Sequence, residues 1–121
     1  MGTAFGESRT VSASSEAKNI MKQLVSKGVF GEQRDVWMLG AALGIALGQV
    51  NEGGTRGTFE NINSLDPEEI FAAIMLGRYP NLSSEDRLKK LVDHAEWGIR
   101  EIFRKHQNGT LDCSALGLPS T

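Results

Sequence analysis

The segment VWMLGAALGIALGQV, residues 36–50, decides the fold. It has no charged residue and one polar residue, Gln49, so none of its faces favours contact with water. It is shorter than the ~20 apolar residues that a membrane-spanning helix needs, and Asp35 and Glu52 lie beside its two ends. We therefore expect residues 36–50 to form a helix that is buried in protein.

Glycines give this expected helix a distinctive surface. Gly40, Gly44 and Gly48 are four residues apart and would lie on one stripe. Each interior glycine costs a helix about 0.5–1 kcal/mol relative to alanine, so three of them call for close packing in return. The stripe predicts a second helix that approaches backbone to backbone, either inside one chain or in a self-associated oligomer.

Two further helices are predicted on the N-terminal and C-terminal sides. Ser14 or Ser15 caps a helix that ends at Gly28, and an apolar stripe runs between them. Ser83 caps the longest helix, which extends to about His106 and carries its own apolar stripe. Four acid-before-base pairs at spacing four on the last helix indicate a solvated outer face, namely Glu85–Lys89, Asp86–Lys90, Glu96–Arg100 and Glu101–Lys105.

The remaining helix has the clearest start signal. Asp66 is the expected cap, Pro67 takes the first helical position and Glu69 completes a capping box. The apolar residues after these are expected to face the core, namely Ile70, Phe71, Ile74 and Met75.

These patterns predict a mainly α-helical protein, a compact four-helix, bundle-like domain over residues 14–109 with the 36–50 helix at its centre. Residues 1–13 are expected to be a flexible lead or a short strand, residues 51–64 a Gly-rich loop or a small hairpin, and residues 110–121 a flexible tail.

Composition limits the class of protein. Apolar residues make up 40% and charged residues 23% of the chain, which is ordinary for a soluble globular protein. The net charge of −2 argues against indiscriminate nucleic-acid binding. A single cysteine, Cys113, and a polar first 15 residues without the apolar region of a signal peptide lead us to expect a cytoplasmic protein without a membrane segment.

Residues with catalytic chemistry are sparse. His94 and His106 lie twelve residues apart, which does not match a pair of metal ligands on one helix, and Cys113 has no base beside it in the sequence. We expect no catalytic residue, no metal and no cofactor. An enzyme without a recognisable motif would instead need a deep pocket with several perturbed carboxylates or histidines.

Two sets of residues are candidates for binding. Trp97 lies off the apolar stripe of the last helix, so the tail residues Leu111, Leu116 and Leu118, the fold itself or a partner protein would cover it, or it is simply exposed. The predicted interface set is Trp97, Arg100, Arg104 and Trp37.

The predicted contacts to nucleic acid or another anion are Arg9, Arg56, Lys89 and Lys90. Of these, Arg56 lies among Gly53, Gly54 and Gly57, in a segment that is either a mobile surface loop or an anion cradle.

Four motifs resemble a known family. They are R-x-V-S at 9–12, L-V-x-x-G-V-F at 24–30, R-D-V-x-M-L-x-A-A-L-G at 34–44 and H-A-E-W-G-I at 94–99. Together they resemble the small accessory proteins encoded beside bacterial and archaeal DNA phosphorothioation (Dnd) systems, over roughly residues 9–109. The resemblance implies an accessory role beside DNA-modification or anti-phage machinery, in which the chain acts with a larger protein, and it places no catalytic residue. Residues 53–57 and the tail beyond Gly109 depart from the family pattern.

A strand followed by two helices is also similar to the ribbon-helix-helix fold, whose paired strands enter the DNA major groove. That alternative would use Arg9, Thr10, Ser12 and Ser14 as contacts to DNA. Protein–protein contact with probable self-association is the preferred expectation, and direct DNA binding is the alternative.

Overall fold

The computed structural model describes residues 4–7 and 9–109. In chain order these residues form β1 (Thr10–Ser14), α1 (Ser15–Ser26), α2 (Gln33–Leu47), β2 (Arg56–Asn61), α3 (Ile62–Leu65), α4 (Ile70–Arg78) and α5 (Ser84–Gln107). The predicted mainly helical fold is confirmed, and it includes the expected short strand near the N-terminus. None of the helices in this part of the chain is long and apolar enough to cross a membrane. The predicted tail at 110–121, with Cys113 and three leucines, lies outside the described residues.

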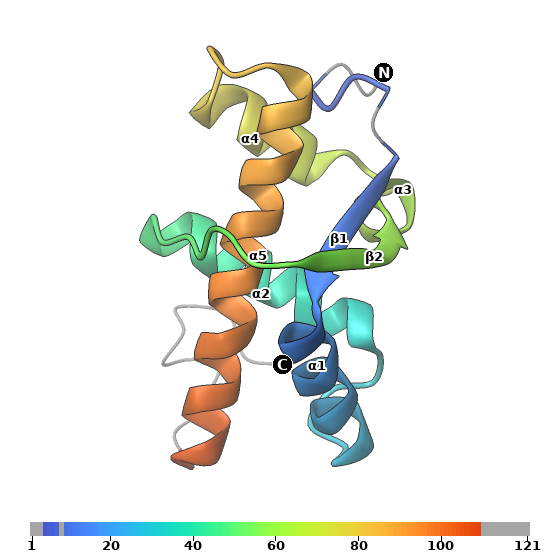
Figure 1. Ribbon diagram of the computed structural model, residues 1–121, viewed down its shortest axis with the longest axis vertical. Coiled ribbons are helices and arrows are strands. Elements are labelled where there is room, and N and C mark those ends of the chain that lie inside the picture. Colours follow the sequence, from blue (N-terminus) through green and yellow to red (C-terminus); the bar gives the residue numbers. More distant parts are fainter. Residues whose placement is uncertain (1–3, 8, 110–121) are drawn as a thin grey trace.

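The crossing of α2 with α5 organises the molecule. Figure 1 shows α5 running along the long axis, with α2 crossing near its middle. A Cβ atom added to Gly44 would lie 2.3 Å from the carbonyl oxygen of His94, and one added to Gly98 would lie 1.8 Å from that of Gly40. The predicted backbone-to-backbone approach along Gly40 and Gly44 is therefore confirmed, and its partner is α5 of the same chain.

The end of α2 differs from the prediction. The helix stops at Leu47, and Gly48 takes a left-handed conformation with φ of 64° as its C-cap. Gly48 therefore does not extend the glycine stripe. Leu47 is 56% exposed, so the C-terminal end of the apolar segment is exposed, contrary to the prediction that residues 36–50 are buried. Glycine accepts this left-handed conformation without strain, which explains why the helix ends there.

The first helix forms as predicted. Ser14 Oγ accepts a hydrogen bond from the Ala17 N–H at 3.0 Å and caps α1. Beyond the other end, Gly28 has φ of 74°, and the Val29 N–H donates to the Leu24 carbonyl at 2.9 Å. These contacts satisfy backbone groups that have no partner inside the helix.

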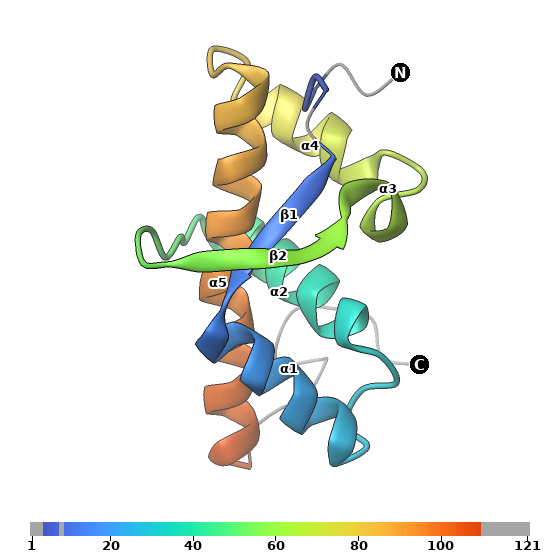
Figure 2. The same ribbon diagram turned by 45° about the vertical axis from the view of Figure 1, so that its right-hand side comes forward.

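The segment at 51–64 does not form a hairpin of its own. Its strand β2 pairs antiparallel with β1, with Thr10 opposite Asn61 and Ser14 opposite Arg56 (Figure 2). The two strands are far apart in sequence, so the local pattern gave no sign of their pairing. Val11 and Ala13 of β1 are each 1% exposed and belong to the core.

The helix after Asp66 begins later than predicted. Asp66 caps α4 by accepting hydrogen bonds from the N–H groups of Phe71 and Ala72, at 3.0 and 2.9 Å. Pro67 precedes the helix, and Glu69 adopts φ of 57° immediately before Ile70 instead of completing a capping box. Asp66 is thus confirmed as a cap, whereas the predicted roles of Pro67 and Glu69 are wrong. The turn between cap and helix lets one carboxylate reach two consecutive amides.

Candidate functional site

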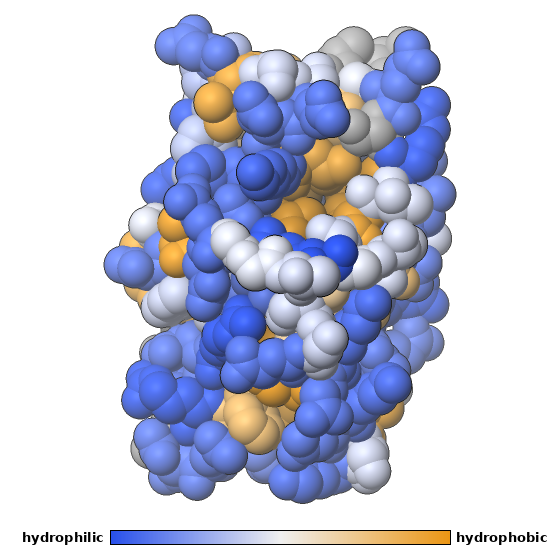
Figure 3. All heavy atoms as spheres, viewed as in Figure 1, coloured by the Kyte–Doolittle hydropathy of each residue, from blue (hydrophilic) through white to orange (hydrophobic). Residues whose placement is uncertain are grey.

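A groove of about 650 Å³ lies between β1, the start of β2 with the glycines before it, and the N-terminal half of α5. Its floor is apolar, because it is formed by the buried residues Val11, Leu88 and Val92. Figure 3 shows apolar atoms in this hollow, above the band that β2 makes across the molecule. We call it the β1–α5 groove. It is lined by Arg9, Thr10, Val11, Ser12, Gly53, Gly54, Arg56, Thr58, Glu85, Asp86, Leu88, Lys89 and Val92.

The periodicity of the two elements explains this lining. In β1, alternate residues face opposite sides, so Val11 is buried while Thr10 is exposed. In α5, Leu88 and Val92 are one turn apart and line the floor, and Lys89 lies beside them at the rim. An extended strand and a helix thus form two walls that run along the groove.

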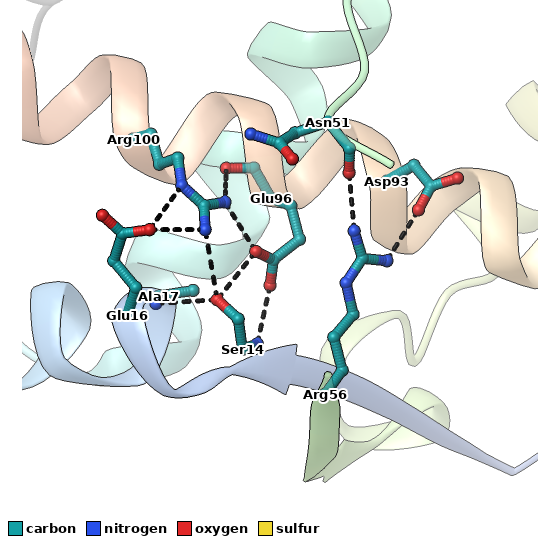
Figure 4. A network of polar contacts seen from close by, with 8 residues as sticks. All are labelled: Ser14, Glu16, Ala17, Asn51, Arg56, Asp93, Glu96 and Arg100. Carbon is teal, nitrogen blue, oxygen red and sulfur yellow. Dashed lines mark hydrogen bonds and ion pairs between the residues drawn. The ribbon is translucent and has the colours of Figure 1, made fainter. Parts of the chain in front are cut away.

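Three of the four predicted anion contacts line this groove, namely Arg9, Arg56 and Lys89. Within residues 4–7 and 9–109, Arg9 and Lys89 are exposed and form no ion pair. Arg56 is different, because its guanidinium donates to Asp93 Oδ1 and to the Asn51 carbonyl, both at 2.6 Å (Figure 4). Arg56 therefore anchors β2 to α5 and is not available as a principal anion contact.

The fourth predicted anion contact lies elsewhere. Lys90 Nζ is 3.2 Å from Glu52 Oε2 and 5.8 Å from the centre of the Tyr79 ring. The pairs expected between Glu85 and Lys89 and between Asp86 and Lys90 are not formed among the described residues. Glu85 and Asp86 instead contribute carboxylates to the lining of the groove, which therefore carries both signs of charge.

The strand edge beside the groove has unpaired backbone groups. The Arg9 carbonyl accepts a hydrogen bond from the Ile62 N–H at 2.7 Å, so the backbone carbonyl of Arg9 points toward β2. Because backbone groups alternate along an antiparallel pair, the next residue, Thr10, directs its N–H and carbonyl to the opposite edge. Among residues 4–7 and 9–109 no further strand pairs with that edge of β1, and in Figure 1 it faces the N-terminal half of α5.

A buried polar network fixes β1 against α5 below the groove. Glu96 is 2% exposed and accepts hydrogen bonds from the N–H and Oγ of Ser14, each at 2.9 Å. Arg100 Nη1 lies 2.6 Å from Glu96 Oε1, and Arg100 Nη2 lies 2.7 Å from Glu16 Oε1 (Figure 4). The sequence predicted the Glu96 and Arg100 pair as part of a solvated face, and the burial of Glu96 corrects that expectation. A buried carboxylate is stable when both of its oxygens accept hydrogen bonds, as they do here.

A second buried group on α5 is His94, which is 1% exposed. Its Nδ1 is 2.7 Å from the Gln49 carbonyl and its Nε2 is 2.9 Å from the Tyr79 hydroxyl. A neutral ring satisfies both contacts, with Nδ1–H donating to the carbonyl and Nε2 accepting from the hydroxyl. Burial lowers the pKa of His94. His94 therefore ties α5 to the segments after α2 and α4, and its burial in the middle of α5 corrects the expectation of a surface or helix-end histidine.

The predicted interface residues do not form one exposed surface. Trp37 is 1% exposed and packs edge-to-face on Phe71 with ring centres 6.1 Å apart, so its assignment to a surface interface is wrong. Trp97 is half-buried against the core. Arg100 is held by the network around Glu96, whereas Arg104 pairs with Glu101 and keeps 58% of its side chain exposed.

Sequence reasoning also missed an exposed apolar face. Ile70 and Ile74 of α4 are 57% and 41% exposed, and Leu76 is 42% exposed. The expectation that Ile70 and Ile74 face the core is wrong, since Ala72 and Met75 are the buried residues of this helix. Nearly every residue of α4 is apolar, so its periodicity did not show which side packs inward.

Among the described residues, no group of three or more His, Cys, Asp or Glu side chains is arranged to hold a metal ion. Comparisons of the chain with protein-family models, with curated proteins and with solved structures found no match.

Proposed function

We propose that this chain is a non-catalytic interaction protein that binds an extended segment of a larger protein in the β1–α5 groove. The observation that carries the proposal is the unpaired edge of β1 at Thr10, which runs beside an apolar floor. Extended peptides bind such edges by adding a strand: the backbone supplies hydrogen bonds and alternate side chains enter the groove. Val11, Leu88 and Val92 would receive those side chains.

The charges of the groove support a peptide as its occupant. Arg9 and Lys89 offer cations, while Glu85 and Asp86 offer carboxylates, so the rim suits a segment that carries both signs of charge. A nucleic-acid backbone carries only negative charge and would meet repulsion from the two carboxylates. The resemblance to accessory proteins of DNA phosphorothioation systems supports a partner within DNA-modification or anti-phage machinery.

The peptide proposal is tested with a phage-displayed library of random peptides, selected on the purified chain. Thr10→Pro removes an N–H from the unpaired edge, whereas the matched control Thr10→Ala keeps it. We expect selected peptides to bind the wild type and Thr10→Ala alike, and to bind Thr10→Pro about tenfold more weakly, the effect of one lost hydrogen bond. Failure to select any peptide, or equal binding by the two variants, would contradict the proposal.

Direct DNA binding is the second candidate, favoured by the unpaired cations Arg9 and Lys89 and by Thr10, Ser12 and Thr58 along the groove. In a ribbon-helix-helix dimer, the strand pairs with the same strand of a second copy. Here β1 pairs instead with β2 of the same chain, so DNA binding would not use the ribbon-helix-helix arrangement. If DNA is the ligand, fluorescence anisotropy with a labelled duplex will show affinity that falls steeply with salt. Arg9→Ala and Lys89→Ala would then each reduce the salt slope by about 1. Absence of duplex binding at low salt would eliminate this candidate.

The cellular setting has its own test. In a host that carries a phosphorothioation system and this chain, we expect deletion of the chain to change the phosphorothioate content of DNA or the restriction of phage. Mass spectrometry of digested DNA measures the first, and plaque counts measure the second. If both stay unchanged, the proposed setting is wrong, although the peptide-binding activity would still stand or fall on the library selection.

A further inference from the structure

The exposed side of α4 has the pattern of a helix-pairing surface. Ile70, Ala73, Ile74 and Gly77 recur at the spacing that places residues on one side of a helix, and all four are exposed. We call these four residues the α4 face. Figures 1 and 2 show α4 at the end of the molecule where α5 begins. Contiguous exposed apolar residues of this kind mark sites of protein association.

The end of α2 carries a further exposed apolar residue. A Cβ atom added to Gly48 would lie 3.6 Å from Nη2 of Arg78, so the long Arg78 side chain extends from the end of α4 toward the end of α2. Leu47, immediately before Gly48, is the fourth large apolar residue that is exposed among the described residues, together with Ile70, Ile74 and Leu76. These four side chains come from two elements, α2 and α4.

The α4 face is complementary to a second copy of itself. In an antiparallel pair of α4 helices with a two-fold axis between positions 73 and 74, Ile70 lies level with Gly77 of the second copy. Ile74 then lies level with Ala73 of the second copy. Each isoleucine therefore meets a small residue, an arrangement that lets two helices pack closely.

Charge at the two ends of α4 favours the same arrangement. Glu68 and Glu69 precede the helix and Arg78 ends it. In an antiparallel pair, the acidic end of each α4 lies beside Arg78 of the other copy. A parallel pair would instead bring like charges together, which is unfavourable.

We propose that this chain forms a symmetric dimer by antiparallel packing of its α4 face on that of a second copy. The dimer does not depend on the β1–α5 groove or on its ligand. The nine residues of α4 span only ~14 Å, so the contact is smaller than the ~1,600 Å² of a standard interface. The dimer is therefore weak, and its population depends on concentration.

The first test is sedimentation equilibrium over a wide concentration range. We expect the mass of the wild type to rise from 13.1 kDa toward twice that value as concentration increases. Ile70→Glu with Ile74→Glu places carboxylates in the contact and should weaken dimerisation at least ~10-fold. Thr58→Glu, at an exposed position of β2, is the matched control and should dimerise like the wild type. Circular dichroism confirms that each variant is folded.

The second test locates the contact by cysteine cross-linking. Ala73→Cys, made in a Cys113→Ser background, places two thiols beside the two-fold axis, where an added oxidant should join them in a disulfide-linked dimer. Ser26→Cys, at the exposed end of α1, is the control and should stay monomeric. A wild type that is monomeric at every concentration, a dimer that survives the two glutamates, or equal cross-linking at positions 73 and 26 would overturn the proposal.

Discussion

Substitution of Gly98 by alanine tests whether the α2 and α5 backbones touch. A Cβ atom at this position would lie 1.8 Å from the carbonyl oxygen of Gly40 and 2.4 Å from its carbonyl carbon. These are backbone atoms, so no side-chain rotation relieves the clash. To reach even the tight distance of 3.0 Å, the contact must open by about 1.2 Å, the difference between 3.0 and 1.8 Å. Gly98→Ala therefore forces the two central helices apart.

The expected cost follows from two opposing effects. Alanine favours the helix by about 0.5–1 kcal/mol relative to glycine. Overpacking a core costs about 1–3 kcal/mol even when side chains can move, and here they cannot remove the contact. We therefore expect Gly98→Ala to lower the free energy of unfolding by about 3 kcal/mol or more. That is a large fraction of the ~5–15 kcal/mol that stabilises a typical domain, and it corresponds to roughly 10 °C in Tm.

Urea denaturation followed by circular dichroism measures the change. Gly77→Ala is the matched control, because Gly77 is also helical but has no atom within 4 Å of the added Cβ. This control should stabilise the monomer by about 0.5–1 kcal/mol. If Gly98→Ala is as stable as the wild type, the close approach of α2 and α5 is not what holds the core together, and our account of the glycine stripe is wrong.

Three further changes test the buried polar groups. Because burial lowers the pKa of His94 below its usual 6.5, the unfolded chain binds more protons, so the free energy of unfolding should fall as pH drops below 6.5, and His94→Gln should lose this dependence in pH-resolved denaturation. Glu96→Gln removes the negative charge that accepts hydrogen bonds from Ser14 and Arg100. It should lower the free energy of unfolding, measured by urea denaturation, by about 2–3 kcal/mol, a figure that allows for the partly exposed Arg100 guanidinium. The control Glu101→Gln should lower it by less than ~1 kcal/mol. Arg87→Lys should cost about 2–3 kcal/mol by the same assay, because the buried guanidinium donates to the carbonyls of Ala4, Tyr79, Pro80 and Leu82 and an ammonium cannot replace all four contacts; an unchanged midpoint would contradict this role.

Local signals in the sequence predicted the elements that depend on local chemistry. Ser14, Ser83 and Asp66 were recognisable as caps because their side chains satisfy amides a few residues away. Gly40 and Gly44 indicated a close helix contact because interior glycines have little other use in a buried helix. Gly98 of α5 was not predicted to be the matching contact, although a glycine inside a long helix also indicates close packing.

Contacts between distant residues were not predictable in the same way. The pairing of β1 with β2 depends on the folded arrangement of the helices between them, so residues 51–64 looked like a loop or a hairpin. The β1–α5 groove needed the strand edge, α5 and the glycines at 53 and 54 to be placed together before Arg9 and Lys89 became neighbours. Trp37 and Trp97 were given similar roles because a tryptophan anchors cores and interfaces alike, and only burial distinguished Trp37.

The hydrogen bonds between Ser14 and Glu96 join residues that are 82 positions apart. During synthesis, the apolar α2 leaves the ribosome well before α5, the helix whose backbone fits against its glycines, has been made. Until then residues 36–47 have no permanent cover, and the nascent chain presents a ready binding site for chaperones. A ribosome-stalled chain that lacks α5 should therefore aggregate or recruit a chaperone, while release of the last helix completes folding in one cooperative step.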